Sequence, residues 1–253
     1  MSLSVVIPAH NEAGSVSETV QAVFAALTRE GISHEIIVVD DHSTDGTAEA
    51  LAGLARTVPT LRVIVNEALP GYGRAVVAGL NAFTGDYVAI MMADLSDDPE
   101  DLVSYWRTAE ETGCDCVFGS RFIRGGAVFD YPKHKLILNR IANNLVRLLF
   151  RIRYNDCTNA FKLYSRETIS GLHPFLSPHF NLTLELPLKA IIRGYSYRVV
   201  PNSWRNRKAG VSKLKIREMG SRYLYILLYC LIEQHFSRGD FRKGRTSRQS
   251  YSR

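Results

Sequence analysis

A chain of 253 residues, 46% of them hydrophobic, is long enough to bury one substantial core, so a single large domain is the simplest expectation. The net charge is +6, and residues 237–253 alone supply +5 of it, from six Lys or Arg and one Asp. Four cysteines without paired spacing argue against a disulfide scaffold or zinc site and favour a reducing compartment. The first residues lack a signal-peptide pattern, so we expect a cytoplasmic protein.

The first half of the chain alternates β-branched runs with helical patterns. We predict strands at 3–9, 34–41, 61–66, 86–95 and 114–122, and helices at 15–30, 47–56, 73–83 and 99–112. This rhythm is typical of an α/β fold with a mostly parallel sheet and helices on both faces. Ligands bind beyond the carboxyl ends of the strands in such sheets. Polar motifs stand at four predicted strand ends: PAHNE, DDHSTDGT, ADLSDDP and GSR.

Two later stretches resemble amphipathic helices. Residues 131–153 mix large apolar side chains with six Lys or Arg, and residues 216–236 follow a similar pattern. Either helix packs on the core or lies at a membrane interface, and a basic tail favours the interface because stable attachment takes several weak signals. The most apolar run, 223–232, is half the roughly 20 residues that span a bilayer. We divide the chain into a domain at 1–215, a helix at 216–236 and a disordered basic tail at 237–253.

Two further motifs indicate a ligand site only when they occur together with other motifs. Asp40 and Asp41 are adjacent carboxylates, which repel each other unless a base, a ribose or a cation shares them. Gly71 and Gly73 open a predicted helix with Arg74 in its first turn, and backbone amides at such a position suit an anionic group. Each pattern also occurs in ordinary turns.

The joint occurrence of six motifs is far more specific. VVIPAHNE, VVDDHSTDGT, ADLSDDPE, GSRF, DCTNAFKLYSR and RKAGVSKLK, in this order, resemble the family-2 inverting glycosyltransferases with a GT-A fold. Within that family the motifs are most similar to the dolichol-phosphate mannosyltransferase group, over about residues 3–215. The resemblance implies transfer of a hexose, with mannose and GDP-mannose favoured, to dolichyl or polyprenyl phosphate. It also implies a peripheral location at the cytoplasmic face of a membrane.

The resemblance assigns roles on the donor side. Asp94 matches the principal ligand of a divalent cation, Mg²⁺ or Mn²⁺, that bridges the donor diphosphate, and Arg121 matches an arginine that handles phosphate. His10 replaces a frequent tyrosine, and its imidazole can still stack on a base. The implied donor-binding residues are Pro8, His10, Asn11, Glu12, Asp40, Asp41, Gly73 and Arg74.

The resemblance also assigns an acceptor side. Lys135 and Asn139 stand where similar enzymes place an arginine and a serine near the lipid phosphate, and Asp156 begins a D-x-T-x-x-F segment like the family's acceptor-side loop. Arg207 opens R-x-x-G-x-S-K-L, which in similar proteins forms a hairpin that closes on the donor phosphates. The implied acceptor-binding residues are Lys135, Asn139, Arg140, Asp156, Ser212 and Lys213.

The expected chemistry follows from charge. A phosphate monoester, with a second pKa of about 6, is already nucleophilic at neutral pH and needs no general base. The acceptor would then be neutralised by Arg121, Lys135, Arg140 and Arg207, and direct attack would invert the anomeric centre. A sugar hydroxyl as acceptor would instead require a carboxylate base, for which Asp97 and Asp156 are candidates.

Other interpretations stay open. The donor could be a UDP-sugar carrying glucose or N-acetylglucosamine, with a lipid phosphate or a saccharide as acceptor. The chain could also be a non-catalytic homologue that binds nucleotide sugars, for which Met92 is the supporting feature. We expect a membrane surface as partner, with a membrane protein or a second copy as further candidates, and no nucleic acid.

The stretch MMADLSDDPE, residues 91–100, holds the candidate metal ligands. Alternate residues at a strand end point the same way, and similar enzymes have an acid where this chain has Met92. Asp94 therefore remains with the weaker ligand Ser96, and Asp97 is a substitute ligand. Asp98 precedes a proline suited to a first helical position, which predicts that it caps a helix with Glu100 in the first turn.

Overall fold

A seven-stranded sheet forms the centre of the protein, whose computed structural model describes residues 1–206 and 216–244, the side chains of 216–219 excepted. In spatial order the strands are β3 (Leu61–Val65), β2 (His34–Asp40), β1 (Leu3–Ala9), β4 (Tyr87–Ile90), β7 (Lys162–Ser165), β5 (Cys116–Ser120) and β8 (Tyr197–Pro201). Strand β7 runs antiparallel to β4 and β5, and the other pairs are parallel. The predicted α/β fold with a mostly parallel sheet is confirmed.

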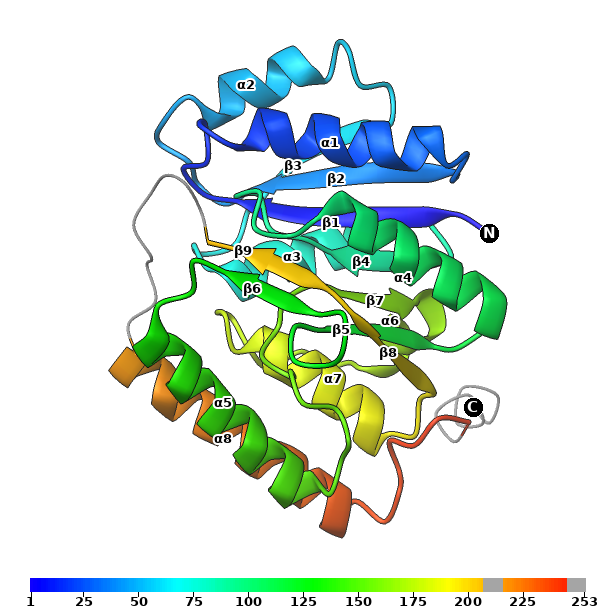
Figure 1. Cartoon of the computed structure of the whole chain (residues 1–253), viewed down its shortest axis with the longest axis vertical. Helices are drawn as coiled ribbons and strands as arrows, with labels where there is room; N and C mark the ends of the chain where they lie inside the picture. Colours follow the sequence, from blue (N-terminus) through cyan, green and yellow to red (C-terminus); the bar gives the residue numbers. More distant parts are fainter. Residues whose placement is uncertain (207–215, 245–253) are drawn as a thin grey trace.

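Helices cover both faces of this sheet (Figure 1). One hydrophobic core lies under α1 (Val16–Arg29), α2 (Thr47–Leu54) and α4 (Pro99–Thr112). The other lies under α3 (Tyr72–Ala82), α6 (Arg166–Gly171) and α7 (Leu182–Ile192). Along β1, Val5 and Ile7 enter the first core and Val6 the second, because successive side chains of a strand point to opposite faces. Burial on both faces explains why β1 reads as a continuous apolar run.

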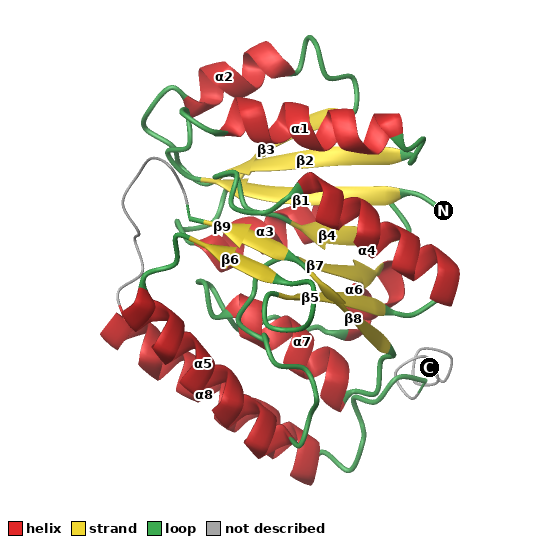
Figure 2. Ribbon diagram, viewed as in Figure 1, coloured by secondary structure: helices red, strands yellow, loops and turns green. Residues whose placement is uncertain are grey.

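Two long helices form an outer pair beyond α7. Figures 1 and 2 show α5 (Lys133–Phe150) and α8 (Ile216–Phe236) side by side, and α8 also packs on α7. A buried ion pair of 2.7 Å between Arg193, which follows α7, and Glu233 of α8 holds this packing together. Helix α5 is shorter than the predicted segment 131–153, because Pro132 precedes it and Arg151, with φ of 54°, ends it.

A small parallel sheet of β6 (Ala127–Phe129) and β9 (Ser203–Arg205) lies apart from the main one. Neither strand was predicted, nor were β7, β8, α6 and α7. The four predicted helices of the first half are all present, with ends within two residues of the prediction. The predicted boundary at residue 215 stays a prediction.

The described part of the predicted basic tail, residues 237–244, makes specific contacts with residues that border β5 and α7. Lys243 Nζ lies 2.6 Å from Asp115 Oδ1, and the Lys243 amide donates to the Arg193 carbonyl at 2.8 Å. The Arg193 guanidinium also lies over the Phe241 ring at 5.0 Å. Residues 237–244 therefore contact the body of the protein, and residues 245–253 lie outside the described part. Within the described residues, no helix is long and apolar enough to cross a membrane.

We expect the predicted cap of α4 to contribute to stability. The Asp98 carboxylate accepts a hydrogen bond of 3.0 Å from the Glu100 amide, with Pro99 in the first helical position. Asp98→Ala should lower the free energy of unfolding by about 1 kcal/mol, or about 2–4 °C in melting temperature, because the amide loses its partner. Thermal unfolding checks this, with Glu110→Ala on the exposed end of the same helix as control. Equal effects of the two substitutions would contradict the capping role.

Candidate active site

The candidate site lies at one edge of the sheet. The parallel strands β1, β2, β4 and β5 all end there, and the antiparallel β7 begins there, since Lys162 pairs with Ile90 of β4 and Phe118 of β5. The loop that precedes β7 therefore reaches the same edge as the strand-end motifs. One edge thus gathers the predicted donor, metal and acceptor segments.

The predicted donor residues after β1 are tied to the loop after β2. The Asn11 amide donates to Ser43 Oγ at 3.0 Å, and Asn11 Oδ1 accepts from the Thr44 amide at 2.7 Å. His10 Nδ1 lies 2.5 Å from the Asp41 carbonyl oxygen, and the Glu12 amide donates to Thr47 Oγ1. Pro8 is buried within β1, opposite Val39. The structure therefore brings His10, Asn11 and Glu12 together with the aspartate pair.

The two adjacent aspartates have different partners. Asp40 Oδ1 accepts from the Ser43 amide at 3.1 Å, which closes the turn after β2. Both oxygens of Asp41 are engaged, one by Asn66 Nδ2 at 2.6 Å and the other by the Gly71 amide at 2.9 Å. Asn66 is buried at the end of β3, and sequence reasoning missed it. Asp41 thus fixes the start of α3.

The two glycines at the start of α3 permit close packing. A Cβ on Gly73 would lie 2.2 Å from the Ser177 carbonyl oxygen, and one on Gly71 would lie 2.5 Å from that of Pro178. The Arg74 amide donates to Pro178 O at 3.3 Å, so this amide and that of Gly71 already have partners within the protein. Loop packing explains the glycines, and donor binding by Gly73 and Arg74 stays a prediction.

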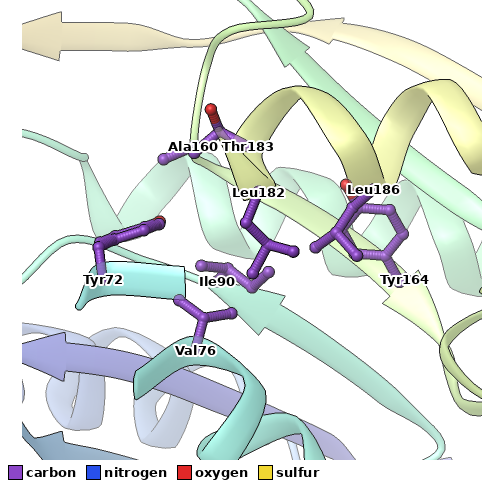
Figure 3. A pocket seen from close by; sticks show the side chains of 8 residues that line it. All are labelled: Tyr72, Val76, Ile90, Ala160, Tyr164, Leu182, Thr183 and Leu186. Carbon is purple, nitrogen blue, oxygen red and sulfur yellow. The ribbon is translucent and has the colours of Figure 1, made fainter. Parts of the chain in front are cut away.

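A small apolar pocket lies between α3 and α7. Figure 3 shows its lining: Tyr72, Val76, Ile90, Ala160, Tyr164, Leu182, Thr183 and Leu186. The Tyr72 hydroxyl is buried and has no hydrogen-bond partner among the described residues. Burial, with smaller contributions from Asp97 and Asp94, raises the pKa of Tyr72, which keeps the phenol protonated. Tyr72, absent from the predicted site, is therefore close enough to Asp94 and Asp97 for their charges to act on its hydroxyl.

The candidate metal ligands lie on a loop and not on a strand. The predicted strand 86–95 ends at Ile90, because the Asp97 carboxylate turns back to accept from the Met92 amide at 3.0 Å. Leu95 has a left-handed φ of 60°, a strained conformation for a branched side chain. The strand-based argument that Met92, Asp94 and Ser96 share one side is therefore wrong. Asp94 Oδ1 instead accepts from the Ser96 amide at 3.2 Å.

Burial of the Asp97 carboxyl raises its pKa to about 7, and nearby Asp94 adds to this shift. The Met92 hydrogen bond and the charge of Arg121 act in the opposite direction. Asp97 is only 4% exposed. A second charge near this carboxylate would therefore determine whether it is ionised at neutral pH.

The loop at residues 91–98, which we call the candidate metal loop, carries side-chain oxygen atoms of the kind that bind a divalent cation. Within the described residues, no group of three or more His, Cys, Asp or Glu is arranged as a metal site. Ser96 Oγ is nevertheless buried without a described partner, and it lies on the same loop as the carboxylates of Asp94 and Asp97. Mg²⁺ and similar ions take oxygen ligands and often use one or two carboxylates beside substrate phosphates. These three residues match that requirement.

A buried ion pair joins the predicted reaction-centre arginine to the predicted acceptor loop. Arg121 Nε and Nη2 donate to the two carboxylate oxygens of Asp156 at 2.8 and 2.7 Å, and the Arg121 amide adds a third bond of 3.1 Å. Asp156 is fully buried, and the Asp156 charge raises the pKa of Arg121. Because both oxygens accept from the guanidinium, Asp156 is poorly suited to act as a general base.

Polar residues of α5 complete this part of the site. Asn139 Nδ2 and Asn143 Nδ2 donate to Thr158 Oγ1 at 2.9 and 3.0 Å. The Arg140 guanidinium lies 4.2 Å from the centroid of the Phe122 ring and donates to the Asn155 carbonyl. Asn143, one helical turn after Asn139, was missed, although its spacing of four residues puts it on the same face.

Three predicted residues cannot be placed. Arg207, Ser212 and Lys213 lie outside the described part of the chain. Strand β9 ends two residues before Arg207. It runs beside the candidate metal loop, since the Arg205 amide donates to the Ser96 carbonyl at 3.0 Å.

The family model for glycosyl transferase family 2 matches residues 4–172. The chain belongs to this family. Dolichol-phosphate mannosyltransferase of Pyrococcus furiosus is 32% identical over 219 residues, which cover 85% of this chain and 60% of that protein. Polyprenol monophosphomannose synthase of Mycolicibacterium smegmatis is 33% identical over 216 residues, covering 83% and 80%. The chain thus spans less than two thirds of the Pyrococcus relative.

Among solved structures, glucosyl-3-phosphoglycerate synthase from Mycobacterium tuberculosis, in complex with Mn²⁺, UDP and phosphoglyceric acid, aligns with a TM-score of 0.69. The alignment covers 91% of this chain and 78% of that one at 23% identity. At this identity the likeness concerns the fold, and the predicted GT-A fold of this family-2 member is confirmed.

The titration of Asp97 predicts a pH-dependent stability. Its pKa in the folded protein, about 7, exceeds the ordinary value, so the folded state binds more protons at weakly acidic pH, and stability falls as the pH rises through 7. In metal-free protein, Asp97→Asn should therefore raise the melting temperature by a few degrees at about pH 8, where each kcal/mol corresponds to about 2–4 °C. At about pH 5 the same substitution should have a much smaller effect. Thermal unfolding with a chelator present measures this.

The exposed Asp98, changed to Asn, is the control for this experiment, because it keeps the cap and removes a solvated charge. A shift of Asp97→Asn that is the same at both pH values would contradict a buried, costly carboxylate.

Proposed function

We propose that the protein is an inverting glycosyltransferase that moves a hexose, with mannose favoured, from GDP-mannose to dolichyl or polyprenyl phosphate at the cytoplasmic face of a membrane. The observation that carries the proposal is the two-sided helix α5. One side holds the acceptor-side loop through Asn139 and Asn143, and the other side is exposed and apolar. A lipid phosphate requires such a combination of polar and apolar surface. The names of the two relatives support mannose as the sugar and a polyprenyl lipid as the acceptor.

The exposed side of α5 continues onto α8. Large apolar side chains 38–78% exposed form what we call the apolar face: Ile137, Leu138, Ile141, Leu145, Leu148, Leu149, Leu224, Tyr225, Leu228, Ile232 and Phe236. Helix α5 carries no acid, and the one acid among residues 220–236, Glu233, is buried in its ion pair with Arg193. Exposed Lys133 and Arg147 lie on α5. An apolar surface that has basic residues nearby, and no exposed acid on α5 or among residues 220–236, suits an anionic lipid surface.

Charge neutralisation is the main task of the site in this proposal. The acceptor phosphate and the donor diphosphate are both anionic, and the acceptor oxygen needs no general base. Lys135, half-buried in the first turn of α5, has no hydrogen bond or ion pair with a described residue and so keeps its donors for a phosphate. Asp156 fixes the Arg121 guanidinium, and the Phe122 ring fixes that of Arg140. Fixed cations stabilise developing negative charge without reorganisation.

The donor side would hold the nucleotide between the segments after β1 and β2. A divalent cation, Mg²⁺ or Mn²⁺, bound by Asp94 with Ser96 and Asp97, would supply Lewis-acid stabilisation of the leaving diphosphate. A neighbouring positive charge would stabilise the ionised form of Asp97, because burial otherwise favours the protonated form. Attack by the acceptor on the face opposite the diphosphate inverts the anomeric centre.

A second candidate function has one observation in its favour. The pKa of Asp97 near 7 suits a general base, which a sugar hydroxyl as acceptor would require. Asp156, the other candidate, is engaged on both oxygens by Arg121. In this second candidate, a UDP-sugar donates glucose or N-acetylglucosamine to a saccharide.

A transfer assay tests the proposal. Purified protein with Mn²⁺ or Mg²⁺ and polyprenyl phosphate should form a β-linked glycolipid from GDP-mannose, and not from UDP-glucose or UDP-N-acetylglucosamine. Asp94→Asn should lower the rate by about 100-fold or more, because it weakens stabilisation of the leaving group. Asp98→Asn, which keeps the α4 cap, should keep the rate. Chromatography of the radiolabelled lipid and analysis of the anomer provide the measurement.

Three outcomes would decide against parts of this proposal. Full activity of Asp94→Asn would remove its assigned role. Transfer from a UDP-sugar to a saccharide, and not to the lipid, would establish the second candidate. Nucleotide binding without any transfer would make the protein a non-catalytic homologue.

The apolar face predicts binding to anionic vesicles. The double variant Leu148→Glu/Phe236→Glu, at two side chains 76% and 78% exposed, should weaken partition onto vesicles containing phosphatidylglycerol by at least about tenfold. Val65→Glu, at an exposed apolar residue of β3 far from this face in the fold, is the matched control. Vesicle co-sedimentation measures both. Unchanged partition of the double variant would contradict a membrane role, and loss of a dimer in its place would assign the face to a second copy or another protein.

A further inference from the structure

A buried lysine stands at the start of β7, outside the residues assigned to the site so far. Lys162 is 1% exposed. Its ammonium group contacts three backbone carbonyl oxygens, those of Cys157 at 3.1 Å, Asn159, and Thr183 at 3.4 Å. An ammonium group has three N–H donors, which match three acceptors. The lysine therefore satisfies carbonyl groups that would otherwise be buried without partners.

Two of these carbonyls belong to residues 156–159, which we call the acceptor loop. Because the loop directs carbonyl groups inward to Lys162, its side chains are available for other partners. Asp156 holds Arg121, and Thr158 holds Asn139 and Asn143 of α5. The contacts of Asp156 and Thr158 with Arg121 and α5 are thus made from a backbone whose Cys157 and Asn159 carbonyl groups are bound by Lys162.

The third carbonyl connects the acceptor loop to the outer helices. Thr183 lies in the first turn of α7, close enough to Tyr223 of α8 to oppose the burial that raises the pKa of this phenol to about 12. Lys162 therefore joins the acceptor loop to α7, which packs on the helix that carries the second part of the apolar face. Lys162 thus lies between the proposed reaction centre and the outer pair of helices.

The charges around Lys162 are balanced. Burial lowers the pKa of Lys162 to about 7, and the positive charge of Arg121 acts in the same direction, while Asp156 and Asp97 favour the protonated form. Two acidic and two basic side chains thus share this buried region, with the Cys157 thiol and the Tyr154 ring also facing the ammonium. Replacing Lys162 would change the balance as well as the hydrogen bonds.

We propose that Lys162 is the positioning residue of the acceptor side, which fixes the acceptor loop so that Arg121 and the polar side of α5 meet the acceptor while Lys162 itself contacts neither substrate. The inference rests on the proposed function for the chemical nature of the acceptor. The positioning itself holds for a lipid phosphate and for a sugar hydroxyl alike, since both would be met by the same loop.

Lys162→Met tests the proposal, because methionine keeps an unbranched side chain and has no N–H donor. We expect the KM for polyprenyl phosphate to rise by about tenfold or more, and the Kd for GDP with Mn²⁺ to change by less than about twofold. Amide hydrogen exchange of residues 156–161 should accelerate by about tenfold or more, because the loop opens more often. A general loss of folding would lower kcat and the active fraction without separating acceptor from donor.

A second buried lysine provides the matched control. Lys189 is fully buried on α7 and pairs with Glu185, but it does not contact the acceptor loop. The double variant Glu185→Gln/Lys189→Met removes both charges of that pair. We expect it to lower the melting temperature while the acceptor KM and the exchange of residues 156–161 stay unchanged.

The outcomes separate this inference from the proposed function. The inference is overturned if folded Lys162→Met shows an unchanged acceptor KM and unchanged hydrogen exchange of residues 156–161. It is also overturned if Lys162→Met loses donor and acceptor affinity to the same extent and the control variant shows the same loss. If the wild type makes no glycolipid, the proposed function fails, and hydrogen exchange still decides the role of Lys162. If Lys162→Met does not fold, Lys162→Gln, with two N–H donors, is measured instead. A smaller acceleration confined to residues 156–161 then supports the inference, and none overturns it.

Discussion

The reversed direction of one strand determines where the candidate site is built. In a purely parallel sheet, every chain segment that enters a strand does so at the edge opposite the ligand site. Strand β7 lies antiparallel between β4 and β5, so its entering loop arrives at the edge where those two strands end. This is why Asp156, carried by a loop that precedes a strand, can reach Arg121, which follows one. The proposed acceptor side depends on this reversal, and the proposed donor side depends on the ordinary βα turns.

This arrangement buries ionisable side chains, which therefore need partners within the protein. Four ionisable side chains of the site, Asp97, Arg121, Asp156 and Lys162, are each no more than 7% exposed. Unpaired charges in such surroundings are strongly unfavourable, whereas hydrogen-bonded pairs are tolerated. Arg121 and Asp156 satisfy each other, and Lys162 is satisfied by carbonyl oxygens. Asp97 accepts a hydrogen bond from one amide. Asp97 and Lys162 are the two of these four groups whose pKa shifts to about 7, because burial favours the neutral form of each. A charge brought by a substrate or a cation would change the ionisation of both groups.

Local sequence signals predicted the first half of the fold and much less of the second. Runs such as LSVVIPA, with turn residues after them, define strands by themselves, and Asp98 before Pro99 defines a helix start. Strands of three to five residues such as β6, β7 and β9 gain their stability from partners far along the chain, which no local pattern reveals. The strand expected to reach residue 95 stops at Ile90 for the same reason, since a side chain five residues on supplies the partner of the Met92 amide.

The site residues that sequence reasoning missed share a physical cause. Asn66 and Lys162 are polar residues buried by tertiary contacts, and base rates place such residues on the surface. The residues that it proposed for the site, such as Asp94 and Arg121, belong to recognisable sequence motifs. The motif that contains Lys162 assigns roles to Asp156 and Thr158 alone, because these two residues match the acceptor-side loop of similar enzymes. The lysine holds the carbonyl groups of the same loop from the opposite side. In the proposed site this motif would act as one unit, in which Asp156 and Thr158 hold the residues proposed to meet the acceptor and Lys162 fixes the backbone of the same loop.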